Sequence, residues 1–156
     1  MNGSGRLRTK LMIVVIGLII LGMIYIFSFK QEGIDQTYLL PSGFEGCVVI
    51  HYNVKDAEPL YIENNQIVYE VPKNGIIHTS SPYDFGWVND EHSGAYQLRA
   101  FYVDDNGEIL EELPHEKIRF GANGSIQEEG KQEKHYHYQI FGLEGIEKEG
   151  CPVLGI

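Results

Sequence analysis

Short β runs separated by turn residues are the feature that most constrains how this chain folds. Apolar and polar residues alternate within the runs, and glycine, asparagine and aspartate gather at the joints between them. In the clearest run, over residues 95–103, Leu98, Ala100 and Tyr102 would share one face of a strand. No ten-residue window beyond residue 30 shows the 3.6-residue period of an amphipathic helix. The pattern predicts an all-β domain.

The turn signals predict how these strands are connected. The expected strands cover residues 47–53, 60–62, 66–71, 76–79, 95–103, 109–110, 117–120 and 134–141. Residues 104–107 (DDNG) suit a tight hairpin turn, and residues 47–53 are apolar on both faces, as in a sandwich core. The predicted fold is a single small antiparallel β-sandwich, immunoglobulin-like or transthyretin-like, behind one N-terminal transmembrane helix. Residues 121–133 are predicted to form a loop.

An uncharged apolar run of nineteen residues occupies positions 11–29. As a helix it would span about 28 Å, close to the thickness of a bilayer core. The run is longer than the apolar region of a signal peptide and lacks a small-residue cleavage site, which predicts an uncleaved signal-anchor. Because Arg6, Arg8 and Lys10 precede it, the positive-inside rule predicts a single-pass cell-membrane protein with a cytoplasmic N-terminus and an extracytoplasmic C-terminal domain.

These signals divide the chain into five segments. They are a short cytoplasmic N-terminus (1–10), the transmembrane helix (11–29), a polar tether (30–37), the extracytoplasmic β-sandwich domain (38–142) and a C-terminal tail (143–156).

The charge of the chain lies almost entirely after the apolar run. Residues 31–156 hold eight basic and 22 acidic residues, which gives a net charge of −14. A surface of that sign repels phosphate backbones, so no nucleic-acid partner is expected. The predicted partners are the membrane, through residues 11–29, and an unknown protein or envelope polymer.

Three turn and strand motifs resemble a known family. They are residues 38–46 (YLLPSGFEG), 72–79 (PKNGIIHT) and 102–107 (YVDDNG). The chain resembles an uncharacterised family, a domain of unknown function, of small membrane-tethered or lipid-anchored envelope proteins of Gram-positive bacteria, which opens with a Leu-Pro-x-Gly-Phe-x-Gly motif. The similarity covers roughly residues 38–142. No cysteine follows the apolar run, which departs from the lipoprotein members, and the resemblance implies no activity for any residue.

Two histidines with metal-ligand chemistry lie in the last predicted strand. His135 and His137 would project from one face about 6.5–7 Å apart, and a stable site would need a third ligand. The histidines that could supply it are His51, His78, His92 and His115. The alternative is an amphipathic edge strand with Tyr136 and Tyr138 inward and both histidines outward.

An aromatic loop over residues 81–93 holds Tyr83, Phe85 and Trp87, the only tryptophan. Aromatic side chains on a surface loop are a common binding-site composition. The alternative is that Phe85 and Trp87 plug the end of the sandwich as part of its core.

Cys47 and Cys151 are the two cysteines of the chain. An even count outside the cytoplasm allows one disulfide, which would join the C-terminal tail to the start of the sandwich. The alternative is a frayed tail with two free thiols.

No sequence motif indicates a reaction. There is no Gly-x-Ser-x-Gly elbow, Walker loop or dinucleotide-binding glycine loop, so neither a catalytic residue nor a cofactor is predicted. The predicted function is a binding or structural module without catalysis. Two alternatives stay open: a metal- or carboxylate-dependent hydrolase of an envelope polymer, and an accessory subunit of another membrane protein.

Overall fold

The computed structural model describes residues 12–23, 32–127, 129–130, 133–151 and 154. The chain forms two compact units, Met1–Glu32 and Gly33–Ile156, which are described separately. In the first unit, residues 12–23 form an α-helix whose apolar side chains are exposed.

This helix corrects the prediction for the N-terminal segment. No helix within the described part of the chain is both long and apolar enough to cross a membrane. This finding overturns the predicted signal-anchor over residues 11–29 and the single-pass topology that rested on it. Residues 11 and 24–29 of the predicted span lie outside the described residues.

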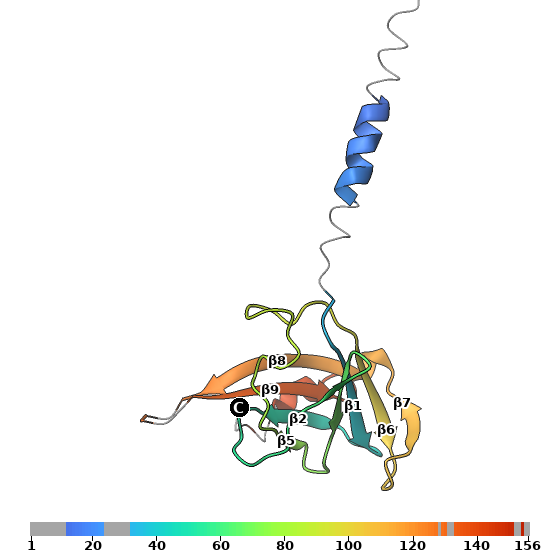
Figure 1. Cartoon of the computed structure of the whole chain (residues 1–156). Helices are drawn as coiled ribbons and strands as arrows, with labels where there is room; N and C mark the ends of the chain where they lie inside the picture. The colour runs from blue at the N-terminus through green and yellow to red at the C-terminus, as the bar shows by residue number, and fades with distance from the viewer. Residues whose placement is uncertain (1–11, 24–31, 128, 131–132, 152–153, 155–156) are drawn as a thin grey trace, which may run out of the picture. The chain divides into compact units, whose positions relative to one another are not determined.

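The second unit is built from two β-sheets (Figure 1). Its strands are β1 (Asp35–Pro41), β2 (Gly46–His51), β3 (Ile62–Glu63), β4 (Gln66–Glu70), β5 (Ile76–His78), β6 (Leu98–Val103), β7 (Ile109–Glu112), β8 (Ile118–Ile126) and β9 (Lys134–Phe141). Two short 3-10 helices are η1 (His115–Lys117) and η2 (Ile146–Glu149). The five-stranded sheet has the order β3-β4-β1-β6-β7, and the four-stranded sheet has the order β5-β2-β9-β8.

Both sheets are mixed, so the predicted antiparallel sandwich, immunoglobulin-like or transthyretin-like, is wrong. Strand β1 runs parallel to both of its neighbours, β4 and β6, and β2 runs parallel to β5. Turn residues identify hairpins such as β3–β4 and β6–β7, which are antiparallel and adjacent in sequence. A parallel pair needs a long crossover, so the local sequence carries no signal for it.

The main core lies between the two sheets. Tyr38 and Leu40 of β1 are fully buried there against Val48 and Ile50 of β2 and Phe141 of β9. A second, smaller cluster covers the opposite face of the four-stranded sheet. Strand β2 is therefore buried on both faces, as the continuous apolar run over residues 47–53 predicted.

Strand β1 begins inside the segment predicted as a tether over residues 30–37. Its first residues are polar, but Asp35 and Gln36 both bond to the backbone of Gln97. The Asp35 carboxylate accepts a hydrogen bond from the Gln97 backbone N–H at 2.8 Å, and the Gln36 N–H donates to the Gln97 carbonyl at 2.9 Å. A central strand whose polar side chains bond to neighbouring backbone lacks the apolar alternation by which strands are found in sequence.

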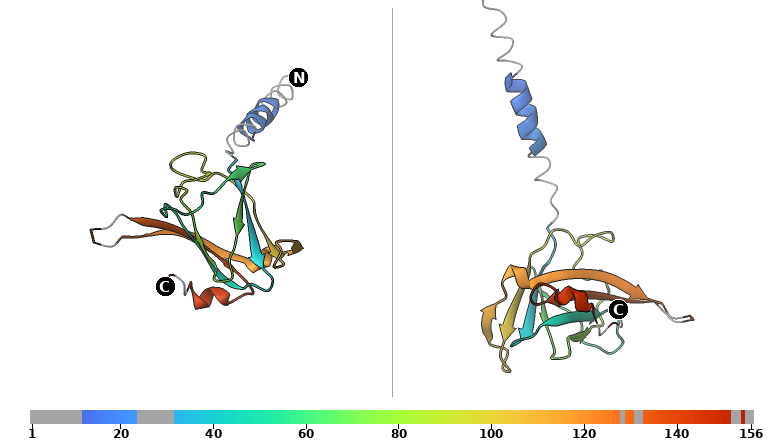
Figure 2. Two further views of the ribbon diagram at one scale, coloured as in Figure 1. Left: turned by 60° about the horizontal axis from the view of Figure 1, so that its bottom comes forward. Right: turned by 180° about the vertical axis from the view of Figure 1, so that it is seen from behind.

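Strand β8 extends to Ile126, into the predicted loop over residues 121–133. The glycines that suggested a loop instead allow close approach, because a Cβ at Gly124 would overlap the ring of Tyr136 on β9. The β8–β9 ribbon projects beyond the rest of the β unit in both views of Figure 2.

The described part of the C-terminal tail packs on the β unit. Ile146 of η2 and Leu154 contact the second hydrophobic cluster, which contains Val49, Ile140 and the buried Cys151. This segment covers one end of the face of the four-stranded sheet that points away from the main core. That face is called the outer face below.

Candidate functional site

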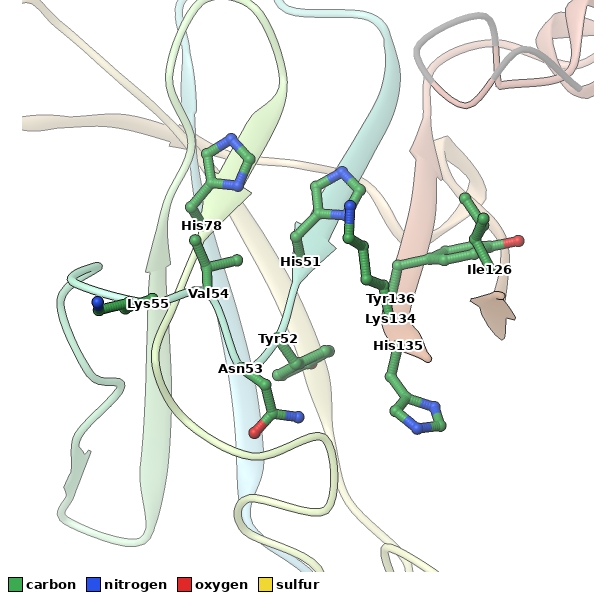
Figure 3. A pocket seen from close by; sticks show the side chains of 10 residues that line it. All are labelled: His51, Tyr52, Asn53, Val54, Lys55, His78, Ile126, Lys134, His135 and Tyr136. Carbon is green, nitrogen blue, oxygen red and sulfur yellow. The ribbon is translucent and has the colours of Figure 1, made fainter. Parts of the chain in front are cut away.

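A pocket of about 460 Å³ opens beside the ends of β2, β5 and β9 (Figure 3). Its lining includes three histidines, His51, His78 and His135, and two lysines, Lys55 and Lys134. None of the ten residues that line it is acidic. This histidine pocket is the best candidate for a functional site.

A row of three aromatic rings crosses the outer face at the pocket. His78 of β5, His51 of β2 and Tyr136 of β9 stand opposite one another in the strand register. The His51 and His78 rings are stacked, with centroids 5.3 Å apart and planes at 18°. The Tyr136 ring lies 6.4 Å from the His51 ring at 56°. On β8 the residue opposite Tyr136 is Gly124, whose missing side chain leaves room for the tyrosine ring.

Lys134 lies two residues before Tyr136 on β9 and therefore on the same face. Its side chain extends toward the His51 ring (Figure 3). Burial, the neighbouring His78 and the Lys134 ammonium lower the pKa of His51 below its ordinary value of 6.5. An uncharged His51 imidazole at neutral pH can both donate and accept a hydrogen bond.

The sign of the charge changes abruptly at the edge of this pocket. A neighbouring cavity of about 470 Å³ shares His78 but is also lined by Glu58, Glu63 and Glu70. The histidine pocket is therefore lined by basic side chains, although residues 31–156 have a net charge of −14.

The predicted metal ligands His135 and His137 lie on the other face of β9. The ring of His135 stacks on Tyr83 with centroids 5.0 Å apart, and His137 pairs with Ile50 on the core side. The predicted orientation is therefore reversed, because Tyr136 packs on the outer face and both histidines face inward. In a His-Tyr-His-Tyr sequence the histidines and the tyrosines clearly lie on opposite faces of the strand. The sequence does not show which of the two faces packs on the core.

His137 contacts the neighbouring strand β8 through one of its ring nitrogens. Its Nδ1 lies 2.7 Å from the side-chain oxygen of Asn123, and its buried Nε2 has no hydrogen-bond partner in the described structure. Burial lowers the pKa of His137 to about 4. Across the described ranges, no group of three His, Cys, Asp or Glu side chains could hold a metal ion.

The other two histidines do not join the site. His92 accepts a hydrogen bond from the Gly94 N–H at 3.2 Å in its own loop, and His115 begins η1. The structure thus brings together only His51 and His78 among the four predicted sources of a third ligand. The sequence gives no sign of this pair, because it depends on the parallel register of β2 and β5.

The aromatic loop supports the pocket through one of its residues. Tyr83 contacts Tyr52 edge-on at 5.7 Å and stacks on His135, and both of these residues line the pocket. Phe85 packs against the main core. Trp87 is half-buried, with its ring 5.1 Å from that of Tyr83. Neither Phe85 nor Trp87 lines the pocket.

Cys47 and Cys151 form a disulfide with their Cα atoms 5.4 Å apart. Both residues are buried, at 7% and 2% exposed. Because Cys47 lies four residues before His51 on β2, its side chain is on the same outer face. The bridge fixes the C-terminal segment over that face and leaves the end with His51 open.

Comparison with known proteins gives a fold and a family. A crystal structure of a protein described as "Putative Lipoprotein from Bacillus anthracis" is similar, with a TM-score of 0.59 and 24% identity over 76% of each chain. At that identity the likeness shows the fold alone. A search of curated proteins finds no match.

The sequence pattern of the "Family of unknown function (DUF6843)" matches residues 32–151, which include nine strands, the histidine pocket and both cysteines. This supports the resemblance to an uncharacterised family. The chain belongs to this family of unknown function.

Proposed function

We propose that the β unit is a non-catalytic binding module whose ligand occupies the histidine pocket. The observation that carries the proposal is the row of His78, His51 and Tyr136 rings in a pocket without acidic residues, on an otherwise acidic domain. Concave sites with aromatic rings and a few convergent polar groups are typical of ligand binding.

The chemistry of the lining favours binding over hydrolysis. The pocket residues include neither a carboxylate nor a thiol nor an aliphatic hydroxyl. Burial raises the pKa of the Tyr52 phenol to about 12, so this hydroxyl stays protonated. The nearby Thr79 hydroxyl donates to the Glu58 carbonyl, and the Ser81 hydroxyl accepts from the Leu60 N–H, so both hold loops together.

The setting of this function is part of the proposal. A disulfide persists in oxidising compartments outside the cytoplasm, which supports an extracytoplasmic envelope protein. The description of the structural neighbour as a lipoprotein from Bacillus anthracis supports the same setting. An envelope polymer or another protein of that compartment is then the class of partner.

NMR spectra of the full chain with isotope-labelled histidine test the proposal. Soluble fragments of envelope polymers are added, and we expect shifts in the His51 and His78 signals while those of His92 and His115 stay fixed. His51→Ala should remove the binding, and His92→Ala, in an exposed loop, is the matched control. Chemical conversion of the fragment, or shifts confined to the distant histidines, would contradict the proposal.

A further inference from the structure

We propose that the ligand group recognised by the histidine pocket is a phosphodiester, held between the stacked His51 and His78 rings and the Lys134 side chain. The inference rests on the proposed function of this pocket and adds the chemical class of its ligand.

The local charge favours an anion although the domain is acidic. The pocket contains Lys55, Lys134 and three histidines and no carboxylate. Charges separated by more than a Debye length, about 8 Å at physiological salt, are largely screened. The groups that line the pocket therefore contribute most to the sign of the ligand, and the carboxylates of the adjacent cavity that shares His78 oppose an anion from one side.

The geometry suits a group with several acceptor oxygens. The His51 and His78 rings project side by side from the sheet, and Lys134 approaches His51 from the next strand (Figure 3). An oxyanion between these groups would accept from two imidazole N–H donors and from a compact ammonium charge. A phosphodiester presents two oxygens that share one negative charge at a tetrahedral centre, and it leaves its two ester arms free to extend along the outer face.

Binding of an anion is coupled to a proton at His51. The groups that face His51 are His78 from β5 and Lys134 and Tyr136 from β9, whereas the Lys55 side chain points away from it (Figure 3). Burial and the neighbouring cations lower the pKa of His51 in the empty pocket. A bound anion stabilises the imidazolium, so the pKa of His51 rises on binding and the affinity increases as the pH falls.

His78 also borders a region of opposite charge. The adjacent cavity that it shares contains Glu58, Glu63 and Glu70. These carboxylates line a cavity that shares His78 with the pocket, and they repel an anion there. The favourable position for one phosphodiester is therefore between His78 and Lys134, over His51.

The test is a titration of the full chain with dimethyl phosphate, whose single charge does not change over the pH range. Histidine NMR signals report the site and the dissociation constant. We expect binding at His51 and His78 to strengthen about tenfold between about pH 7.5 and about pH 5.5, because a bound anion favours the His51 imidazolium. His51→Gln, which stays neutral, should abolish this pH dependence, and Lys134→Gln should weaken binding at every pH. His92→Gln is the matched control and should change neither.

A neutral saccharide, N-acetylglucosamine, separates this inference from the proposed function. If the saccharide shifts the His51 and His78 signals and dimethyl phosphate does not, the phosphodiester is wrong and the binding pocket stands. If dimethyl phosphate shifts only the other histidines, both are wrong.

Two sources of the phosphodiester are then separated by competition. A soluble poly(glycerol phosphate) that displaces dimethyl phosphate assigns the group to a polymer. Displacement by phosphatidylglycerol vesicles but not by the polymer assigns the group to a lipid headgroup. Either result supports the proposed chemistry.

Discussion

The two ends of the outer face of the four-stranded sheet have the same strands but different surroundings. At the covered end, Cys47, Val49 and Ile140 lie beneath the C-terminal segment and are buried. At the open end, His51 and Tyr136 continue the same rows of side chains but border a pocket. The alternation along β2 determines which side chains lie on the outer face. The C-terminal segment determines whether those side chains are buried or border the pocket.

The covered end is expected to depend on the disulfide, and its removal has the largest predicted effect. In the loop-entropy model, a bridge across a sequence separation of 104 residues stabilises the folded state by about 4–5 kcal/mol. Cys47→Ser combined with Cys151→Ser should therefore lower the free energy of unfolding in urea by that amount. A reductant should destabilise the natural chain but not the double variant.

The same double variant sharpens the comparison at the open end. The stack of His51 and His78 is formed by β2 and β5 alone, so their NMR signals should persist in the folded double variant. Loss of both signals while the fold is retained would show that the two ends are not independent.

The second prediction concerns the core side of β9, where His137 should make the stability of the fold depend on pH. His137 is half-buried and neutral in the folded chain with a pKa of about 4, and the unfolded chain takes up a proton near pH 6.5. The unfolded state then binds more protons, so stability falls as the pH drops from about 6.5 to about 4, by about 3 kcal/mol, and levels off below. Urea unfolding at several pH values measures this loss.

His137→Gln separates this effect from other titrating groups. Glutamine keeps a polar group near Asn123 and does not titrate, so the part of the acid destabilisation that His137 causes should disappear. His92→Gln is the matched control and should keep the full pH dependence. An unchanged pH dependence in His137→Gln would overturn the assignment.

A third prediction concerns Trp87, for which core and binding roles were both open. A fully buried tryptophan would cost about 3–5 kcal/mol on replacement by alanine. Trp87 is half-buried and contacts Tyr83 at the edge of the main core, so we expect about 2 kcal/mol, measured by urea unfolding. The variant should still bind ligand, because Trp87 does not line the pocket. A loss of binding at unchanged stability would assign Trp87 to the site.

Local patterns predicted some elements of the fold well. The apolar run of β2 and the hairpin between β6 and β7 are confirmed, because both depend on residues close in sequence. In that hairpin the Asp104 carboxylate accepts hydrogen bonds from the N–H groups of Asn106 and Glu108, which is the chemistry that its sequence indicates.

Long-range features were not predictable in the same way. The parallel pairing of β1 with β4 and β6 joins segments far apart in sequence, so no turn residue marks it. The row of His51 and His78 follows from such a pairing. The apolar run over residues 11–29 indicated a membrane span, but no helix among the described residues is long and apolar enough to cross a membrane.

The smallest predicted effect tests why the open end holds a tyrosine ring. A Cβ at Gly124 would overlap the ring of Tyr136, but the overlapping atoms are at the far end of a side chain that can rotate. Gly124→Ala should therefore cost only about 1 kcal/mol in unfolding free energy while it moves the ring away from His51. Ser125→Ala, at an exposed neighbouring position of β8, is the matched control. The Tyr136→Ala background should remove the cost of Gly124→Ala, because the overlap no longer exists. A cost that persists in that background would mean that Gly124 is required by the backbone of β8 rather than by the ring.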